Sequence, residues 1–243
     1  MTMTDYSYIQ ENVKRIRARM QEAAREAGRP DDAALVAAVK YADTDEVNYL
    51  HTKCGITDIG ENRVQQLLER WDHLKDRETL RIHFIGTLQP NKVKYIIGKV
   101  CLIHSLDSVK LAEEIEKRAK AAGLTVDVLV EINSGEETSK SGVLPKDVAD
   151  FCRVLSRFPH IRHLGFMTMA PKCENSGDYI KYFTETYRLC LDIWYKILHN
   201  STMPIMSMGM SESFEEAIRC GATVVRVGRA LFAKPEAIPE NKE

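Results

Sequence analysis

One lysine and two short polar turns are the residues of this sequence whose types and positions best suit chemistry. Lys40 directly follows residues 34–39, a continuous apolar run of strand length. Burial at the end of such a strand disfavours the charged form of a lysine, and a neutral amine can attack a carbonyl group and form a Schiff base. The alternative is that Lys40 begins a solvated loop, and its position alone does not separate the two.

The two polar turns have the composition of an anion-binding site. Residues 208–211 read Met-Gly-Met-Ser and precede an expected helix over residues 212–220, so backbone N–H groups and the Ser211 hydroxyl could face an anion. Gly228 and Arg229 follow the last apolar run, and a glycine lets the backbone approach a ligand closely. A Schiff-base lysine opposite a phosphate site describes either a pyridoxal 5′-phosphate (PLP) pocket or a sugar-phosphate aldolase, and both remain open at this point.

Eight strand-length apolar runs alternate with helical segments and must position these residues. The expected strands lie at about residues 34–39, 58–60, 81–86, 100–104, 125–132, 161–167, 204–208 and 223–227. Strands that alternate with helices pair in parallel through right-handed crossovers. The sequence therefore predicts an α/β protein, a (β/α)8 TIM barrel over about residues 34–232. An open doubly wound sheet is the alternative, disfavoured because no G-x-G-x-x-G motif follows the first strand.

The ends of the chain flank this barrel. Apolar residues recur at three- and four-residue steps near the N-terminus and predict an extra helix over about residues 6–28. Residues 233–243 are polar, include two prolines and are expected to form a frayed tail. We expect residues 1–243 to form a single domain.

The barrel topology indicates where a site should lie. Active sites of (β/α)8 barrels are built from the carboxyl ends of the strands and the loops that follow them, and the loops after strands seven and eight commonly bind phosphate. Polar residues at the expected strand ends are Lys40, Asn62, Asn133, Ser207, Ser211, Arg226 and Arg229. His83 and His104 lie on separate strands without metal-ligand spacing around them, so we expect them to be core histidines.

Composition limits the partners and the compartment. The 34 basic and 35 acidic side chains give a formal net charge of −1, so no global basic field favours nucleic acid or anionic lipid. The N-terminal segment lacks the apolar core of a signal peptide, and no apolar run is long enough to span a bilayer. The six cysteines are scattered without a C-x-x-C pair. We expect a cytoplasmic monomer with reduced cysteines that binds neither nucleic acid nor membrane.

Several short segments, in order along the chain, resemble those of a known family. They read Gly-Glu-Asn at 60–62, His-Phe-Ile-Gly at 83–86, Ser-Lys-Ser-Gly at 139–142, Gly-Phe-Met at 165–167, Met-Gly-Met-Ser at 208–211 and Val-Arg-Val-Gly at 225–228. From about residue 35 to residue 232 the sequence resembles the YggS/PROSC family of pyridoxal-phosphate homeostasis proteins. The resemblance implies a single PLP-binding barrel of fold-type III, similar to the N-terminal domain of alanine racemases.

The resemblance also implies roles for particular residues. Lys40 would form the internal aldimine with PLP, and Asn62 would lie beside the cofactor ring. Arg226 would face the pyridine nitrogen, where a permanently charged guanidinium disfavours protonation and weakens PLP as an electron sink. The other residues assigned to the cofactor are Met167, Ser207, Ser211, Gly228 and Arg229. The phosphate group would be bound by Ser207 or Ser211 together with Gly228 and Arg229.

The sequence departs from the family pattern after the lysine, at Arg229, at Ser213, where an acidic residue is expected, and at Ala233, where a glycine is expected. Tyr41 follows the lysine where the family usually has Thr-Lys-Pro, and we expect this ring to pack rather than to act chemically. Arg229 stands where a small hydroxyl residue is usual, so charge rather than a hydroxyl would hold the phosphate there.

The expected function follows from the number of acid/base groups. Racemisation needs one such group on each face of the substrate, and in alanine racemase-like enzymes a tyrosine of a second domain supplies one of them. The sequence ends at residue 243, shortly after the last expected barrel element, so we expect no second domain. We therefore expect a PLP homeostasis protein that buffers the cofactor or delivers it to apo-enzymes without robust turnover. The alternatives are an amino-acid racemase that uses Tyr41 or His104 as the second base, or a Schiff-base aldolase.

Overall fold

Eight parallel strands close into a barrel in the order of the sequence, with β8 paired back to β1. The computed structural model describes residues 5–29 and 33–235. The strands are β1 (Ala34–Ala38), β2 (Asp58–Glu61), β3 (Arg81–Phe84), β4 (Leu102–Leu106), β5 (Val126–Ile132), β6 (Ile161–Thr168), β7 (Ile205–Ser207) and β8 (Val224–Val227). The predicted (β/α)8 barrel is confirmed, and the open doubly wound sheet is excluded.

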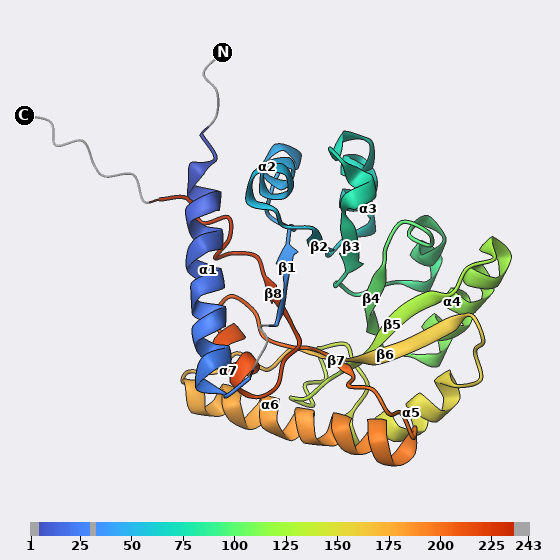
Figure 1. The fold of residues 1–243 in the computed structure, drawn as a ribbon. Helices are drawn as coiled ribbons and strands as arrows, with labels where there is room; N and C mark the ends of the chain where they lie inside the picture. The colour runs from blue at the N-terminus through green and yellow to red at the C-terminus, as the bar shows by residue number, and fades with distance from the viewer. Residues whose placement is uncertain (1–4, 30–32, 236–243) are drawn as a thin grey trace, which may run out of the picture.

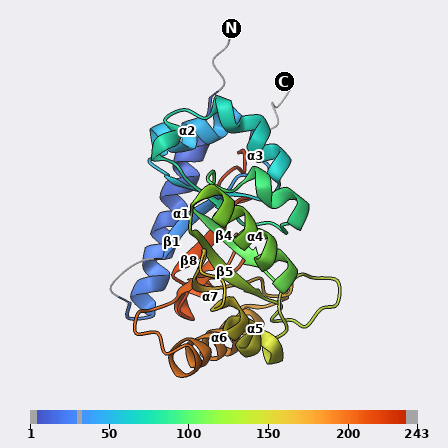
Figure 2. The ribbon, with the colours of Figure 1, turned by 90° about the vertical axis from the view of Figure 1, so that its right-hand side faces the viewer.

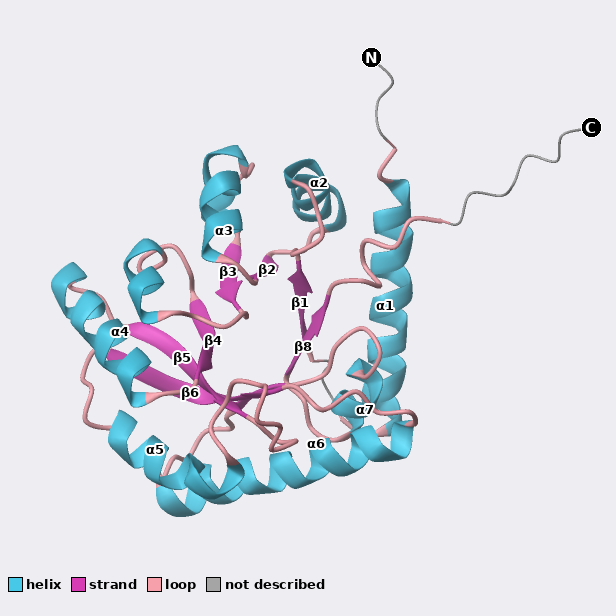
Figure 3. Cartoon of the chain, turned by 180° about the vertical axis from the view of Figure 1, so that it is seen from behind, coloured by secondary structure: helices cyan, strands magenta, loops and turns pink. Residues whose placement is uncertain are grey.

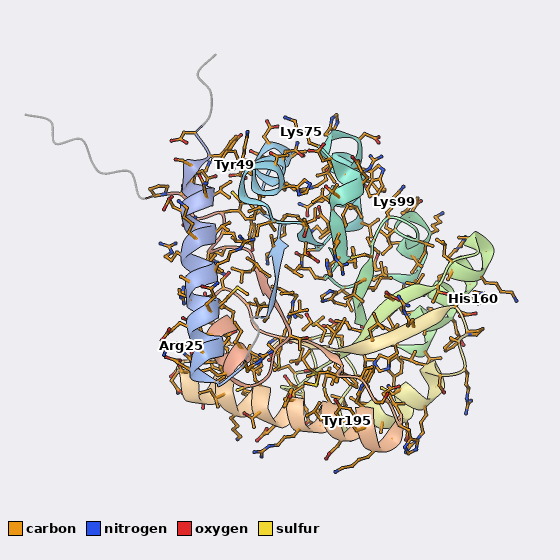
Figure 4. The ribbon with its side chains drawn as sticks, viewed as in Figure 1. Arg25, Tyr49, Lys75, Lys99, His160 and Tyr195 are labelled. Carbon is orange, nitrogen blue, oxygen red and sulfur yellow. The ribbon has the colours of Figure 1, made fainter. Side chains whose placement is uncertain are left out.

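Helices surround the strands as an outer ring (Figures 1 and 3). They are α1 (Ser7–Glu26), α2 (Thr44–Cys54), α3 (Val64–Arg70), α4 (Val109–Ala122), α5 (Val148–Leu155), α6 (Ser176–Leu191), extended by the π-helical segment Asp192–Ile197, and α7 (Phe214–Arg219). The view in Figure 2 shows the strands between α2 and α3 at one end of the picture and α5 and α6 at the other. Figure 4 labels side chains on the outer ring, such as Arg25 on α1 and Tyr195 after α6.

The predicted N-terminal helix is present as α1 and covers part of the barrel. Its buried residues Ile9, Val13, Ile16 and Met20 recur at helical spacing and belong to the main apolar core. The helix packs against α7 and α2. Its apolar stripe explains why the helix stays on the barrel, since burial of such side chains is the main stabilising contribution.

Local capping and turn formation determine where several of these helices begin. The N-cap of α2 is Asp43 rather than Thr44; the Asp43 carboxylate accepts from the Glu46 backbone N–H, and the Glu46 carboxylate accepts from the Asp43 N–H. This reciprocal capping box satisfies two backbone donors at once. After β3 the chain forms a 3-10 helix, Pro90–Tyr95, with Pro90 at its first position. The helix expected from residue 212 begins at Phe214, because residues 211–213 form a turn.

The interior of the barrel is layered along its axis. At the amino-terminal ends of the strands, Arg81 pairs with Asp58 at 3.0 Å and Arg162 pairs with Asp127 at 2.6 Å. Further toward the carboxyl ends the interior contains an apolar cluster of Leu102, Leu129 and Met167, together with histidine side chains. Buried polar side chains lie at the carboxyl ends. Side chains alternate between the two faces of a strand. Those that point outward pack under the helices, and those that point inward fill the barrel.

The structure bears on the expectations about cysteines, membrane spans and metal sites. All six cysteines are free. No helix in the described part of the chain is long and apolar enough to cross a membrane. No group of His, Cys, Asp and Glu side chains within residues 5–29 and 33–235 could hold a metal ion. The expected frayed tail lies outside the described residues from residue 236 onward.

Candidate cofactor-binding site

A cavity of about 230 Å³ opens at the carboxyl ends of the strands. This volume is close to the lower end of the range for small-molecule sites. The lining residues are Ala38, Lys40, Tyr41, Asn62, Ile85, Met169, Tyr179, Met210, Ser211, Glu212, Ser213, Arg226, Gly228 and Arg229. Six of the eight site residues inferred from the sequence therefore meet in one pocket, and Met167 and Ser207 do not line it.

Lys40 enters the pocket just beyond the end of β1. Its Nζ atom lies over the Tyr41 ring, 4.7 Å from the ring centroid. Both side chains are exposed, Tyr41 to 67%. Of the two alternatives for Lys40, the structure favours the one in which this residue begins a solvated loop, and the expected packing of Tyr41 is not observed. The apolar residues of β1 turn toward the core, whereas the chain leaves the barrel at Lys40.

Asn62 follows β2 and presents an unusual polar atom to the same pocket. Its Oδ1 atom is buried and has no hydrogen-bond partner within the described residues. The end of β3 approaches its backbone so closely that a Cβ atom at Gly86 would lie 2.1 Å from the Asn62 carbonyl oxygen. A buried acceptor without a donor is unfavourable, so a ligand that donates to it would be stabilised.

Arg226 on β8 supplies a buried positive charge at the pocket wall. Its Nη1 donates to the carbonyl oxygen of Ser207 at 2.7 Å and to the Ser207 Oγ at 2.6 Å, and its Nη2 donates to the Thr168 carbonyl at 3.0 Å. Burial lowers the pKa of Arg226 to about 10, against a smaller opposing effect of Glu131. The guanidinium therefore stays charged at neutral pH.

Glu131 on β5 is an acidic side chain whose negative charge stabilises the charged form of Arg226. Its Oε1 atom accepts from the Ser141 hydroxyl at 3.1 Å. Burial raises the pKa of Glu131 to about 7, although Ser141 and Arg226 act in the opposite direction. Near neutral pH this carboxyl is therefore poised between its two protonation states.

Met167 and Ser207 lie one level deeper than the pocket. They are register neighbours on β6 and β7. Met167 belongs to the apolar cluster inside the barrel, and Ser207 is fully buried by its contacts with Arg226 and His104. Of the two serines considered for the phosphate, only Ser211 reaches the cavity.

Ser211 belongs to the loop that follows β7 and contacts the loop that follows β8. The backbone N–H groups of Gly228 and Ala230 point at its Oγ atom, at 3.4 and 3.3 Å. A Cβ atom at Gly228 would lie 2.7 Å from the Ala38 carbonyl oxygen, so this close approach to β1 requires glycine. The convergence of two backbone donors and a hydroxyl suits an oxyanion.

The surroundings of Ser211 correct one expectation and qualify another. Ser211 does not stand at the start of a helix, because α7 begins after Ser213. Arg229 lines the pocket and pairs through its Nη1 with Glu212 Oε1 at 2.6 Å, with both side chains exposed. Arg229, whose charge was expected to hold the phosphate, is therefore already paired with the Glu212 carboxylate.

Tyr179 and Met169 also line the pocket and were not inferred from the sequence, whereas Met210, which lines it too, lies in the turn at 208–211. Tyr179 comes from α6, and its hydroxyl accepts from the Cys173 backbone N–H at 3.3 Å. No local pattern marks this tyrosine, because the path of the loop after β6 brings it to the mouth. Met169 lies just beyond β6 at a strand end, which was the available signal for it.

The fold is that of the alanine racemase N-terminal domain, whose family model matches residues 7–235. A solved alanine racemase from Clostridium difficile 630 superposes with a TM-score of 0.72 at 17% identity, over 94% of this chain and 58% of that one. The level of identity makes this a likeness of fold.

Within that class the chain belongs to the family of pyridoxal phosphate homeostasis proteins, as the sequence resemblance predicted. It is 42% identical to the pyridoxal phosphate homeostasis protein of Aquifex aeolicus over 224 residues, which is 92% of this chain and 97% of that one. The relative from Pseudomonas aeruginosa is 35% identical, over 93% and 95%. The structure of PipY from Synechococcus elongatus with PLP bound has a TM-score of 0.80 at 25% identity, over 93% of this chain and all of that one.

Proposed function

We propose that this protein binds PLP in the mouth pocket, attached through the amine of Lys40, and serves PLP homeostasis rather than catalysis. The observation that carries the proposal is that one cavity combines an accessible lysine, a buried guanidinium and a hydroxyl faced by two backbone N–H groups. These are the groups needed for an aldehyde, a pyridine ring and a phosphate. The names of the relatives and the PLP-bound PipY structure support it.

Each of these residues has a distinct role in the proposal. Lys40 holds the aldehyde end, and Ser211 with the N–H groups of Gly228 and Ala230 holds the phosphate end. Asn62 lies beside the ring, where its unpartnered Oδ1 atom can accept a hydrogen bond. Arg226 faces the ring nitrogen. Bound PLP supplies an electron sink for carbanion chemistry, and a charged guanidinium at its nitrogen weakens that sink.

The positions of the acid/base groups support a carrier over a racemase. His104 does not line the pocket and both of its ring nitrogens are in hydrogen bonds, so it is unavailable as a second base. Tyr41 contacts the Lys40 amine itself. A carrier would buffer PLP and hand it to apo-enzymes. The six free cysteines fit a reducing compartment, and we include the cytoplasm in the proposal.

An amino-acid racemase is the second candidate, and one observation favours it. The phenol of Tyr179 lines the pocket and comes from α6 rather than from the Lys40 loop. A second acid/base group from a different element is what racemisation requires. Exchange of the α-proton of amino acids in deuterated water at enzyme-like rates, lost in Tyr179→Phe, would establish this activity and overturn the carrier proposal.

The main test is attachment of PLP to Lys40. Purified protein is loaded with PLP, its absorbance spectrum is recorded, and borohydride reduction followed by peptide mass mapping locates the label. We expect the label on Lys40 and its loss in Lys40→Ala. Lys75→Ala, which removes an exposed lysine labelled in Figure 4 that is not among the pocket-lining residues, is the matched control and should bind like the wild type. Absence of PLP uptake, or labelling of another lysine, would contradict the proposal.

A further inference from the structure

A chain of hydrogen bonds crosses the barrel interior beneath the pocket. It begins on β2 at Asp58, whose Oδ1 lies 2.9 Å from His83 Nε2. His83 Nδ1 lies 2.9 Å from His104 Nε2, and His104 Nδ1 lies 2.9 Å from Ser207 Oγ. The chain ends on β8, where Arg226 donates to the same hydroxyl at 2.6 Å. Five strands thus contribute one link each, and both histidines are buried.

The two ends of this chain limit the directions that its hydrogen bonds can take. A guanidinium can only donate. Burial acts to raise the pKa of Asp58, but hydrogen bonds from His83, Thr57 and Arg81 lower it to about 2, so Asp58 is a carboxylate and can only accept. Burial holds the pKa of His104 well below its ordinary value, so this ring is neutral and carries one proton.

When His83 carries a single proton, which Asp58 holds on Nε2, the hydrogen bonds run in one direction from Arg226 to Asp58. Ser207 accepts from the guanidinium and donates its proton to His104 Nδ1. The Nε2–H of His104 then donates to His83 Nδ1, and the Nε2–H of His83 donates to Asp58. The reverse direction would place a proton on both ring nitrogens of His83, since each would have to donate.

The hydroxyl is the adjustable part of the Arg226 site. Arg226 has three acceptors here, of which the carbonyl oxygens of Ser207 and Thr168 belong to the strands and have set directions. The Ser207 hydroxyl can rotate about its C–O bond, so its lone pairs face the guanidinium only while its proton has another acceptor. His104 Nδ1 is that acceptor.

We propose that His104 and His83 are positioning residues for Arg226, which lock the Ser207 hydroxyl and so hold the guanidinium at the place where it faces the ring of bound PLP. This inference rests on the proposed PLP site, although neither histidine touches the cofactor. Its consequence is that a change deep in the barrel alters the electronic state of bound PLP. A histidine that merely packs would not have this effect.

The first test compares the histidine of the chain with one outside it. His104→Leu removes the acceptor for Ser207, while His104→Asn places a side-chain amide near the former Nδ1 and should restore much of the wild-type behaviour. His163→Leu is the matched control, because His163 is a partly buried histidine that lies outside the hydrogen-bond chain; its Nε2 lies 2.8 Å from the Gly165 carbonyl oxygen, and its ring packs edge-on against Phe166.

The readouts are the absorbance spectrum of bound PLP and the PLP dissociation constant. We expect His104→Leu to shift the absorbance maximum and to weaken PLP binding about tenfold, as for loss of an oriented charged hydrogen bond. His163→Leu should lower the melting temperature and leave both readouts unchanged. Equal spectra and affinities for the His104 and His163 variants would overturn the inference. If His104→Leu does not fold, Ser207→Ala replaces it with the same expectation.

The second test requires no PLP. Nitrogen-15 NMR of the histidine rings in the unloaded protein should show Nδ1 unprotonated and Nε2 protonated in both His83 and His104. A proton on His104 Nδ1, or on both nitrogens of His83, would overturn the inference. If the wild type takes up no PLP, the proposed function fails, while these nitrogen shifts still decide the direction of the chain.

Discussion

Replacement of Glu131 by Gln should stabilise the protein above neutral pH. Glu131 is buried on β5, and the Ser141 hydroxyl at 3.1 Å is a weak substitute for the water it has lost. Burial therefore raises its pKa from 4.5 to about 7. Gln has nearly the same shape as the protonated carboxyl, and it cannot ionise.

The direction of the stability change follows from how many protons Glu131 binds in the folded and in the unfolded protein. Between pH 4.5 and about 7 the folded protein keeps a proton on Glu131 that the unfolded chain has released. The free energy of unfolding therefore falls as pH rises through this window, and the contribution is fully present only below pH 4.5. The separation of the two pKa values corresponds to about 3 kcal/mol. Glu131→Gln should retain this contribution at every pH.

Urea denaturation from pH 4.5 to pH 8 measures the effect. We expect the two proteins to be similarly stable at the acidic end, and the variant to be more stable by about 2–3 kcal/mol at pH 8. Glu61→Gln is the control. Burial also raises the pKa of Glu61 to about 7, but its Oε1 lies 3.0 Å from Arg70 Nε. That variant leaves a buried arginine unpaired and should be destabilised by about 3 kcal/mol. An unchanged pH dependence in Glu131→Gln would refute the reasoning.

Two further predictions concern folding. Gly165→Ala should destabilise the protein by about 3 kcal/mol or more, because φ is +150° and the added Cβ would lie 2.1 Å from the Ile205 carbonyl oxygen; Gly98→Ala, where the added Cβ keeps ordinary contact distance, should lose only about 1 kcal/mol in urea denaturation. Similar losses in the two variants would contradict this. Asp43→Ala should lower the free energy of unfolding by about 1 kcal/mol because the capping box with Glu46 is lost; a variant as stable as the wild type would show that the cap contributes nothing.

The order of strands and helices was predictable because its signals are local. Apolar runs of strand length, turn residues and helical periodicity each act within a few residues, and all eight strands appear where these signals place them. The errors occur where two local signals compete. At residues 211–213 the Ser213 hydroxyl accepts from the Met210 backbone N–H and stabilises a turn where helix was expected.

The sequence predicted which strand ends carry site residues, but not which of those residues reach the pocket. Lys40, Asn62 and Arg226 reach the pocket as expected, whereas Met167 and Ser207 lie below it. All five stand at or near the end of a strand, and the sequence does not show how deep each end lies. Depth depends on the stagger between neighbouring strands, which closure of the barrel imposes.

The sequence by itself determined the class of fold, the family and the lysine at the end of β1, because these depend on residue types and their spacing along the chain. Only the tertiary structure decided which polar groups meet. Ser207 and His104 are separated by 103 positions yet share a hydrogen bond, and Tyr179 reaches the mouth from α6. Such contacts exist only once the sheet has closed, since closure brings β4 and β7 to face each other across one interior.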